Sequence, residues 1–323
     1  MRNISVGTLG SWSLIIGPVL AVVCYLIQPG VMLIDQADPS NAQATMGALM
    51  GTPMLSQADQ AVAHADITFN TELDVISKLS AAAERAGRTH GVVLMVELGD
   101  LREGIMPGDL EATVRAMLRF PNLELKGIGT NLACRSGASP SATNMAELSA
   151  LADSIDATFG TALGIVSGGN SANLNWALSG GDIGRINDLR LGEALLLGCE
   201  TLHHQPIEGL HTDAIALVAE VIESKAKPSL PWGEVAQTAF GEEPPAIDRG
   251  VMSQTILAVG RQDVDPRGLH SSHGIEVLGA SSDHLIVNSG EDRLPVGSEV
   301  TFQLNYSALV RAMTSPFVEK VAT

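Results

Sequence analysis

The chain has 323 residues, 45% of them hydrophobic, enough to form a large α/β domain and a smaller second domain. Its 36 Asp and Glu residues outnumber 19 Lys and Arg, and the resulting net charge of −17, with no basic stripe, argues against a nucleic-acid partner. The three cysteines, Cys24, Cys134 and Cys199, show neither metal-ligand spacing nor an even-numbered disulfide framework. We therefore expect a reducing, cytoplasmic location and no metal site.

The first 43 residues differ in pattern from the rest of the chain. Residues 14–27 form an uncharged apolar run interrupted by Gly17 and Pro18. The run has about the length of a signal-peptide core and is shorter than the roughly 20 residues of a spanning helix. We expect a buried or irregular segment rather than a membrane contact. A signal peptide or membrane anchor is the alternative.

From Ala44 onward, apolar strand-like runs alternate with helical patterns. This alternation predicts a parallel sheet covered by helices. The predicted strands are 48–51, 65–69, 92–98, 125–130, 163–166 and 189–197. The predicted helices are 55–64, 71–86, 107–119, 141–159 and 172–178.

The pattern changes after about Pro206, where helical periodicity fades. Short Val- and Ile-rich segments follow, separated by Pro, Gly and Asp turns, which predicts a mainly antiparallel β domain of about a hundred residues. The predicted organisation is an atypical segment 1–43, an α/β domain 44–205 and a β domain 206–323. The β segments are expected at 214–222, 255–259, 275–278, 284–287 and 299–304.

The stretch Leu163–Gly198 is the most informative one chemically. A short apolar run ends at the glycine-rich residues 167–171, and a helix is predicted directly afterwards. Glycines allow close backbone approach, and the free N–H groups of a helix start suit a phosphate. Arg190 lies in the next apolar run and needs an acceptor if it is buried. An ordinary βα turn with a structural ion pair at Arg190 is the alternative.

Seven motifs taken together carry a resemblance to a known family, the PLP-dependent alanine/ornithine racemases, with the ornithine racemase branch most similar. The resemblance implies a (β/α)8 TIM-type barrel that holds pyridoxal 5′-phosphate (PLP) at its C-terminal mouth. It also implies a β domain that completes the site of a neighbouring subunit in a homodimer, and a small amino acid as substrate. The motifs are Val92–Gly104, Gly127–Cys134, Ile165–Ser171, Leu189–Gly198, Gly260–Leu269, Gly279–Val287 and Leu304–Lys320.

The same resemblance implies roles for individual residues. Arg190 faces the pyridine nitrogen, and because it is always protonated it cannot give that nitrogen a proton. Arg102 resembles the barrel arginine near the substrate carboxylate or the opposing base, and Asn131 stands where alanine racemases carry a stacked histidine. The residues implied to hold the phosphate are Ser167, Gly168, Gly169, Asn170 and Ser171, helped by Gly192 and Glu193, and Tyr306, which could equally be a half-buried strand tyrosine.

The resemblance is weaker for the residue that would act as a base on the opposite face of the substrate. Alanine racemases use a β-domain tyrosine there, whereas the comparable segment Gly260–Leu269 has none. Among the acidic residues available, Asp283 resembles best a family aspartate that lines the neighbouring subunit's site, and Asp263 is a second candidate. Turn-forming aspartates are the alternative.

The barrel itself is incomplete in the sequence. Eight βα units of about 30 residues are needed, and only six strands are predicted between Ala48 and Leu197. The family also places its Schiff-base lysine at the end of the first barrel strand. No lysine precedes Lys78, and all five lysines are interpreted as surface residues. We expect a lost or substituted first strand, which leaves open a racemase, a non-catalytic PLP-binding protein and an inactive truncated homologue.

Overall fold

The computed structural model describes residues 57–242, 247–271, 274–291 and 293–322. These residues divide into two compact units. Unit 1 comprises the described residues up to Leu195 together with Cys199–Ile207. Unit 2 comprises Leu196–Gly198 together with the described residues from Glu208 onward. The predictions for segment 1–43, for residues 14–27 and for a strand at 48–51 lie outside the described residues. None of the helices in the described part of the chain has the length and apolarity needed to cross a bilayer.

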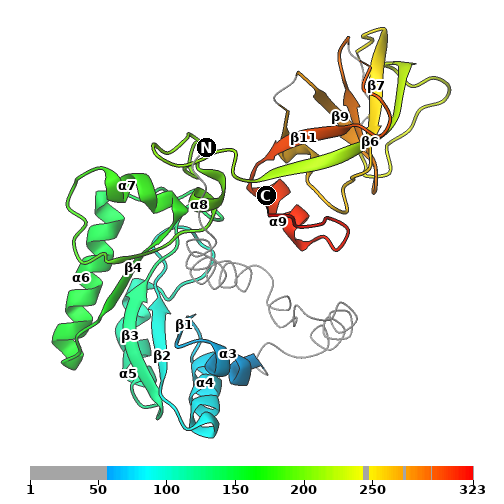
Figure 1. Ribbon diagram of the computed structural model, residues 1–323. Coiled ribbons are helices and arrows are strands. Elements are labelled where there is room, and N and C mark those ends of the chain that lie inside the picture. The colour runs from blue at the N-terminus through cyan, green and yellow to red at the C-terminus, as the bar shows by residue number, and fades with distance from the viewer. Residues whose placement is uncertain (1–56, 243–246, 272–273, 292, 323) are drawn as a thin grey trace. The chain divides into compact units, whose positions relative to one another are not determined.

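Unit 1 is built on an open sheet of parallel strands, paired in the order in which they occur in the chain. Sequential parallel pairing with helical connections is the arrangement of a (β/α) barrel, of which these strands form about half. Figure 1 shows the sheet with α4, α5 and α6 along it. The strands are β1 (Ile67–Asn70), β2 (His90–Met95), β3 (Leu123–Gly129), β4 (Ile165–Asn170) and β5 (Asp188–Arg190).

The helices of unit 1 follow from apolar spacing and from their caps. In α4, buried Ile76, Leu79 and Ala83 recur three and four residues apart, and Gly87 ends the helix in the left-handed conformation. Ser141 starts α6 through a capping box with Asn144. The helical segments are α3 (Ala58–His64), α4 (Leu73–Ala86), η2 (Pro107–Asp109), α5 (Leu110–Met117), α6 (Ala142–Phe159), η3 (Ser171–Asn173), α7 (Leu174–Leu178) and α8 (Glu193–Leu197).

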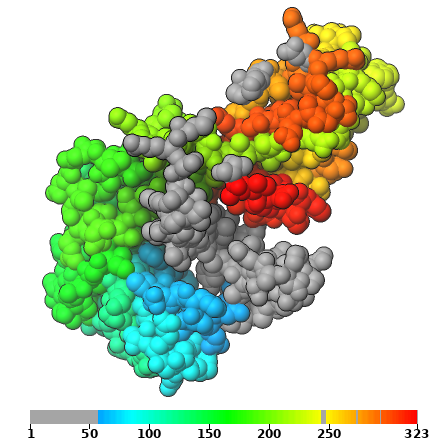
Figure 2. All heavy atoms as spheres, viewed as in Figure 1, coloured from blue at the N-terminus to red at the C-terminus, as the bar shows by residue number. Residues whose placement is uncertain are grey.

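The core of unit 1 lies between the sheet and these helices. All six residues of β2 are buried, as expected of a central parallel strand covered on both faces. Val92 and Leu94 belong to one cluster with Val114 of α5 and Leu148 of α6. In the space-filling view, green atoms from the region of α6 and α7 form one side of unit 1, and blue to cyan atoms from the region of α3 and α4 form another (Figure 2).

Unit 2 is a nearly closed antiparallel barrel with the strand order β8-β11-β6-β7-β10-β9. The long strand β6 pairs with β11 through its first half and with β7 through its second half. Exposed and buried residues alternate in β11 and through the first half of β6, so one face of each points into a core around Phe302. The elements are β6 (Ala216–Pro228), β7 (Val251–Leu257), η4 (Pro266–Gly268), β8 (Leu269–His270), β9 (Glu276–Ala280), β10 (Leu285–Asn288), β11 (Glu299–Leu304) and α9 (Tyr306–Thr314).

The structure confirms the fold class, a partial (β/α)8-type barrel with a mainly β C-terminal domain, and corrects local assignments. The strand predicted at 189–197 is wrong, because β5 ends at Arg190 and Glu193–Leu197 is helix α8. A short apolar run does not distinguish a buried strand from a buried helix, and Gly192 separates the two elements here. The turn predicted from Ser167 is also wrong, because β4 continues to Asn170. Tyr306 begins helix α9 rather than lying in the last strand.

Candidate functional site

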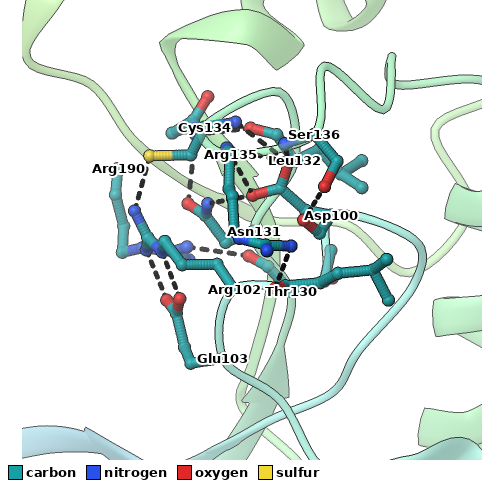
Figure 3. Close-up of polar contacts among 12 residues, drawn as sticks. Asp100, Arg102, Glu103, Thr130, Asn131, Leu132, Cys134, Arg135, Ser136 and Arg190 are labelled. Atoms are coloured by element: carbon teal, nitrogen blue, oxygen red, sulfur yellow. Dashed lines mark hydrogen bonds and ion pairs between the residues drawn. The ribbon is translucent and has the colours of Figure 1, made fainter.

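Arg190 lies at the carboxyl ends of the parallel strands, held by three neighbouring segments. Its Nη1 donates a hydrogen bond of 2.5 Å to Ser167 Oγ, and its Nη2 donates one of 2.7 Å to the carbonyl oxygen of Thr130. The guanidinium carbon lies 4.9 Å from the centroid of the Phe69 ring, within cation–π range. Figure 3 shows Arg190 beside Thr130 and near Arg102 and Glu103. The sheet thus fixes a cation at the position predicted for a barrel-mouth site.

Arg190 keeps its positive charge in spite of its burial. Removal from water lowers the pKa of Arg190 to about 10, an effect that nearby Arg102 adds to and that Asp188 and Glu103 partly offset. The guanidinium therefore stays protonated at neutral pH and can only donate hydrogen bonds. A pyridine nitrogen facing it would be held in its unprotonated, acceptor form.

The glycine-rich segment predicted to cradle a phosphate is held by contacts with Asn173 and with the loop after β3. Gly169 has φ +143°, and a Cβ there would lie 2.2 Å from Asn173 Oδ1, so only glycine fits. The Asn170 amide donates to Asn131 Oδ1 at 3.0 Å and to the Leu132 carbonyl at 2.8 Å. Asn131 and the segment are thus brought together, and the predicted position of Asn131 beside a cofactor ring stays a prediction.

The next turn is tied to the same segment through Ser171. Its hydroxyl oxygen accepts hydrogen bonds of 3.2 Å from the backbone N–H groups of Gly192 and Ala194. These two donors and the hydroxyl form a small polar group at the strand ends, in the position where the resemblance puts a phosphate. Ser171 and Gly192 therefore lie together, and Glu193 lies between the two donating residues.

A carboxylate that the sequence did not indicate holds two loops of the site together. Buried Asp100 follows β2 and accepts hydrogen bonds from the backbone N–H groups of Cys134, Arg135 and Ser136 at 3.0–3.1 Å. Ser136 Oγ in turn donates to the Asp100 carbonyl at 2.7 Å (Figure 3). Residues Leu101 and Ala133, beside these contacts, have left-handed φ values of 56° and 54°. The hydrogen bonds to Asp100 therefore hold Leu101 and Ala133 in a backbone conformation that is strained for any residue other than glycine.

Arg102 lies in the loop that Asp100 anchors. Its guanidinium donates two hydrogen bonds to the Glu103 carboxylate, and its Nη1 lies 2.6 Å from Cys134 Sγ. The hydrogen bond with Glu103 is the main cause that raises the pKa of Arg102. Arg102 is close enough to Arg190 for their charges to interact. Its predicted contact with a substrate carboxylate stays a prediction.

Two carboxylates near α8 differ in ionisation. Burial, together with the neighbouring Glu200, raises the pKa of Glu193 to about 7. Burial also acts on Glu200, but backbone N–H groups of Gln205, Leu202 and His203 donate to its carboxylate and lower its pKa. Glu193 is therefore partly protonated at neutral pH, beside the turn that holds Ser171.

Glu193 makes stability depend on pH. Because its pKa is higher in the folded state, the unfolded chain loses this proton first, and stability falls as pH rises from about 4.5 to 7. We expect Glu193→Gln to be close to neutral at pH 4.5 and to stabilise the protein by about 2 kcal/mol at pH 8. Urea unfolding at both pH values measures this, with exposed Glu208→Gln as control. An equal effect of Glu193→Gln at both pH values would contradict the prediction.

The candidate residues of unit 2 are placed by contacts within that unit. Buried Asp263 accepts from Ser315 Oγ at 2.8 Å and from the Gly260 N–H at 3.3 Å. Exposed Asp283 accepts from Ser282 Oγ at 2.8 Å, and Tyr306 is half-buried at the start of α9. The roles predicted for Asp263 and Asp283 in a neighbouring subunit's site, and for Tyr306 toward a phosphate, stay predictions.

All five lysines of the chain belong to the described residues. Lys126 is the fourth of the seven residues of β3 and pairs with Glu124 at 2.7 Å. Lys78 is exposed on α4, and no other lysine belongs to unit 1. The remaining three, in unit 2, are Lys225, Lys227 and Lys320. The described residues that contact Arg190 or act on its charge include no lysine.

A half-barrel of parallel strands, followed in the chain by an antiparallel β barrel, matches part of the fold of solved alanine racemases. The family model of the alanine racemase N-terminal domain matches residues 31–199, and the chain belongs to this PLP-dependent family.

Two curated relatives place the chain more closely. Ornithine racemase of Acetoanaerobium sticklandii is 40% identical over 277 residues, covering 84% of this chain and 78% of the relative. Lysine racemase of Thermotoga maritima is 37% identical, covering 84% and 77%.

Solved structures agree at the level of the fold. Alanine racemase from Streptomyces coelicolor has a TM-score of 0.57 at 20% identity, covering 79% of this chain and 66% of that one. Alanine racemase from Bartonella henselae, solved with covalently bound pyridoxal phosphate, has a TM-score of 0.55 at 15% identity, covering 85% and 77%.

Proposed function

We propose that this protein is an amino-acid racemase homologue of the ornithine type that binds PLP at the strand ends of unit 1 without a covalent link. The observation that supports binding is Arg190, a buried cation held by Ser167 and Thr130 where the family's cofactor ring would lie. The observation that argues against a covalent link is the lysine distribution. The proposed ligand besides PLP is a basic amino acid, because the curated relatives are ornithine and lysine racemases.

Each residue would contribute recognition or proton control. PLP, when bound, supplies a ring that withdraws electrons from the α-carbon of an attached amino acid. Arg190 would donate to the ring nitrogen and keep it unprotonated, and Ser171 with the Gly192 turn would bind the phosphate. Arg102 would bind the substrate carboxylate. From a second copy of the chain, Tyr306 would reach the phosphate and Asp283, with Asp263, would carry the proton on the opposite face. We further propose a cytoplasmic homodimer.

The missing covalent link gives the sharpest test of this function. We expect that borohydride reduction in the presence of stoichiometric PLP, followed by peptide mass spectrometry, yields no pyridoxyl adduct specific to one lysine. The Arg190→Met variant, which lacks the proposed contact with the PLP ring, is the control. Adducts that form equally in this variant and in the wild-type protein arise from random labelling of exposed lysines. A single lysine adduct that disappears in Arg190→Met would show a Schiff base and would contradict noncovalent binding.

Racemisation of ornithine is the second candidate function, favoured by the 40% identity to an ornithine racemase across most of the chain. The test is the optical rotation of L-ornithine, L-lysine and L-alanine with protein and PLP. Because no lysine among the described residues contacts Arg190 or acts on its charge, we expect no loss of rotation beyond that caused by PLP alone. A faster loss with protein would establish the second candidate in place of the first.

A further inference from the structure

Asp188 is linked to Arg190 through the hydroxyl group of Ser167. It lies opposite Ser167 in the register of β4 and β5, and the Ser167 hydroxyl donates a short hydrogen bond to its Oδ2. The same hydroxyl accepts the 2.5 Å hydrogen bond from Arg190 Nη1. Ser167 is completely buried and Asp188 is half-buried. A carboxylate, a hydroxyl and a guanidinium thus form one chain of hydrogen bonds.

The direction of this chain is fixed by its two charged ends. A hydroxyl has one proton to donate and lone pairs to accept with. The Asp188 carboxylate can only accept and the Arg190 guanidinium can only donate, so the Ser167 proton points to Asp188 and its lone pair to Arg190. With both ends charged, each bond is of the stronger, charge-assisted kind.

We propose that Asp188 is a positioning residue that acts through Ser167 to hold Arg190 in place for a pyridine-type ring nitrogen. This inference rests on the proposed function. It assigns Ser167 to the arginine rather than to the phosphate, because both hydrogen-bonding directions of its hydroxyl are already used. Ser171, four residues later, remains the phosphate-side hydroxyl of the segment.

Charge compensation supports the same assignment. The charged groups that act on buried Arg190 are Asp188 and Glu103, which favour its protonated form, and Arg102, which opposes it. Glu103 is already engaged by Arg102 through two hydrogen bonds. Of these two carboxylates, Asp188 is therefore the one connected to Arg190 by hydrogen bonds, whereas Glu103 is bonded to Arg102.

The first test needs no cofactor. Urea unfolding of Asp188→Ala, Arg190→Met and the double variant measures the coupling between the two side chains. We expect non-additive effects, with Asp188→Ala costing clearly less stability when Arg190 is already methionine. Additive effects would overturn the proposal. If Asp188→Ala does not fold, Asp188→Asn takes its place, because its amide oxygen keeps the acceptor and removes only the charge.

The second test uses PLP and inorganic phosphate as probes. We expect Asp188→Ala and Ser167→Ala each to weaken PLP binding about tenfold, and their combination to weaken it no further, since both act through one hydroxyl. Asp188→Asn should restore part of the affinity, and phosphate binding should stay unchanged in all of them. Asp182→Asn, at an exposed turn, is the matched control. Equal losses for phosphate and PLP would overturn the proposal.

A spectroscopic measurement separates positioning from general destabilisation. In Asp188→Ala, the pH at which the absorbance of bound PLP changes should move toward that of free PLP, because a displaced guanidinium no longer faces the ring nitrogen. An unchanged pH profile with weakened binding would overturn the proposal. If the wild-type protein fails to bind PLP, the proposed function fails, while the unfolding experiment still decides on Asp188.

Discussion

Arg190→Met is expected to weaken PLP binding by about 10- to 100-fold while lowering thermal stability only slightly. The loss in affinity corresponds to one charge-assisted hydrogen bond, about 1.5–3 kcal/mol. The loss of stability should stay small, because the hydrogen bonds lost to Ser167 and Thr130 are partly offset by the desolvation cost that the buried ion no longer incurs. The substitution thus separates binding from folding.

Fluorescence titration with PLP and a thermal unfolding scan measure these two effects. Arg119→Met, in an exposed position after α5, is the matched control and should change neither quantity. If the melting temperature of Arg190→Met dropped by several degrees while PLP affinity stayed the same, Arg190 would be a structural residue of the sheet, the alternative left open by its sequence.

Asp100→Ala is expected to cost about 3 kcal/mol of unfolding free energy. Three backbone N–H groups lose a charged acceptor at once, and hydrogen bonds to charged groups contribute roughly 1.5–3 kcal/mol each without adding fully. The strained residues Leu101 and Ala133 also lose the contacts that hold them. Because Arg102 lies in the same loop, PLP or amino-acid binding should weaken together with stability.

Asp100→Asn and Asp109→Ala are the comparison variants for the unfolding free energy of Asp100→Ala. Asparagine keeps one acceptor oxygen and should cost about half as much in urea unfolding, whereas Asp109 is exposed and should cost less than 0.5 kcal/mol. Equal costs for Asp100→Ala and Asp109→Ala would show that the loops keep their conformation without the carboxylate.

The order of strands and helices in unit 1 was predictable because its pairing is local. β1 to β5 pair as consecutive neighbours, and α4 and α6 show the spacing and caps that specify helices. The family was predictable from motifs that run the length of the chain, and the comparisons confirm it. The position of Arg190 as the last residue of β5 did not follow from that pattern, because the predicted strand 189–197 puts Arg190 near its start.

What could not be predicted depends on contacts between distant segments. Asp100 binds backbone groups 34–36 residues later, and a backbone N–H leaves no trace in the sequence. The resemblance implies a phosphate contact for Ser167, but resemblance does not show the hydrogen bonds that its hydroxyl makes within the protein. Its actual partners lie on β5, where an apolar run concealed the end of the strand and the start of α8.

The pairing of β6 has a consequence for the order in which the chain folds. Unit 1 joins strands as they emerge, whereas residues 216–220 of β6 pair with β11, about 80 residues later. Bringing such distant segments together costs chain entropy before any contact stabilises them. During synthesis, this half of β6 therefore remains an exposed edge until Glu299–Leu304 has been made, and unit 2 should be the slower-folding, more aggregation-prone unit.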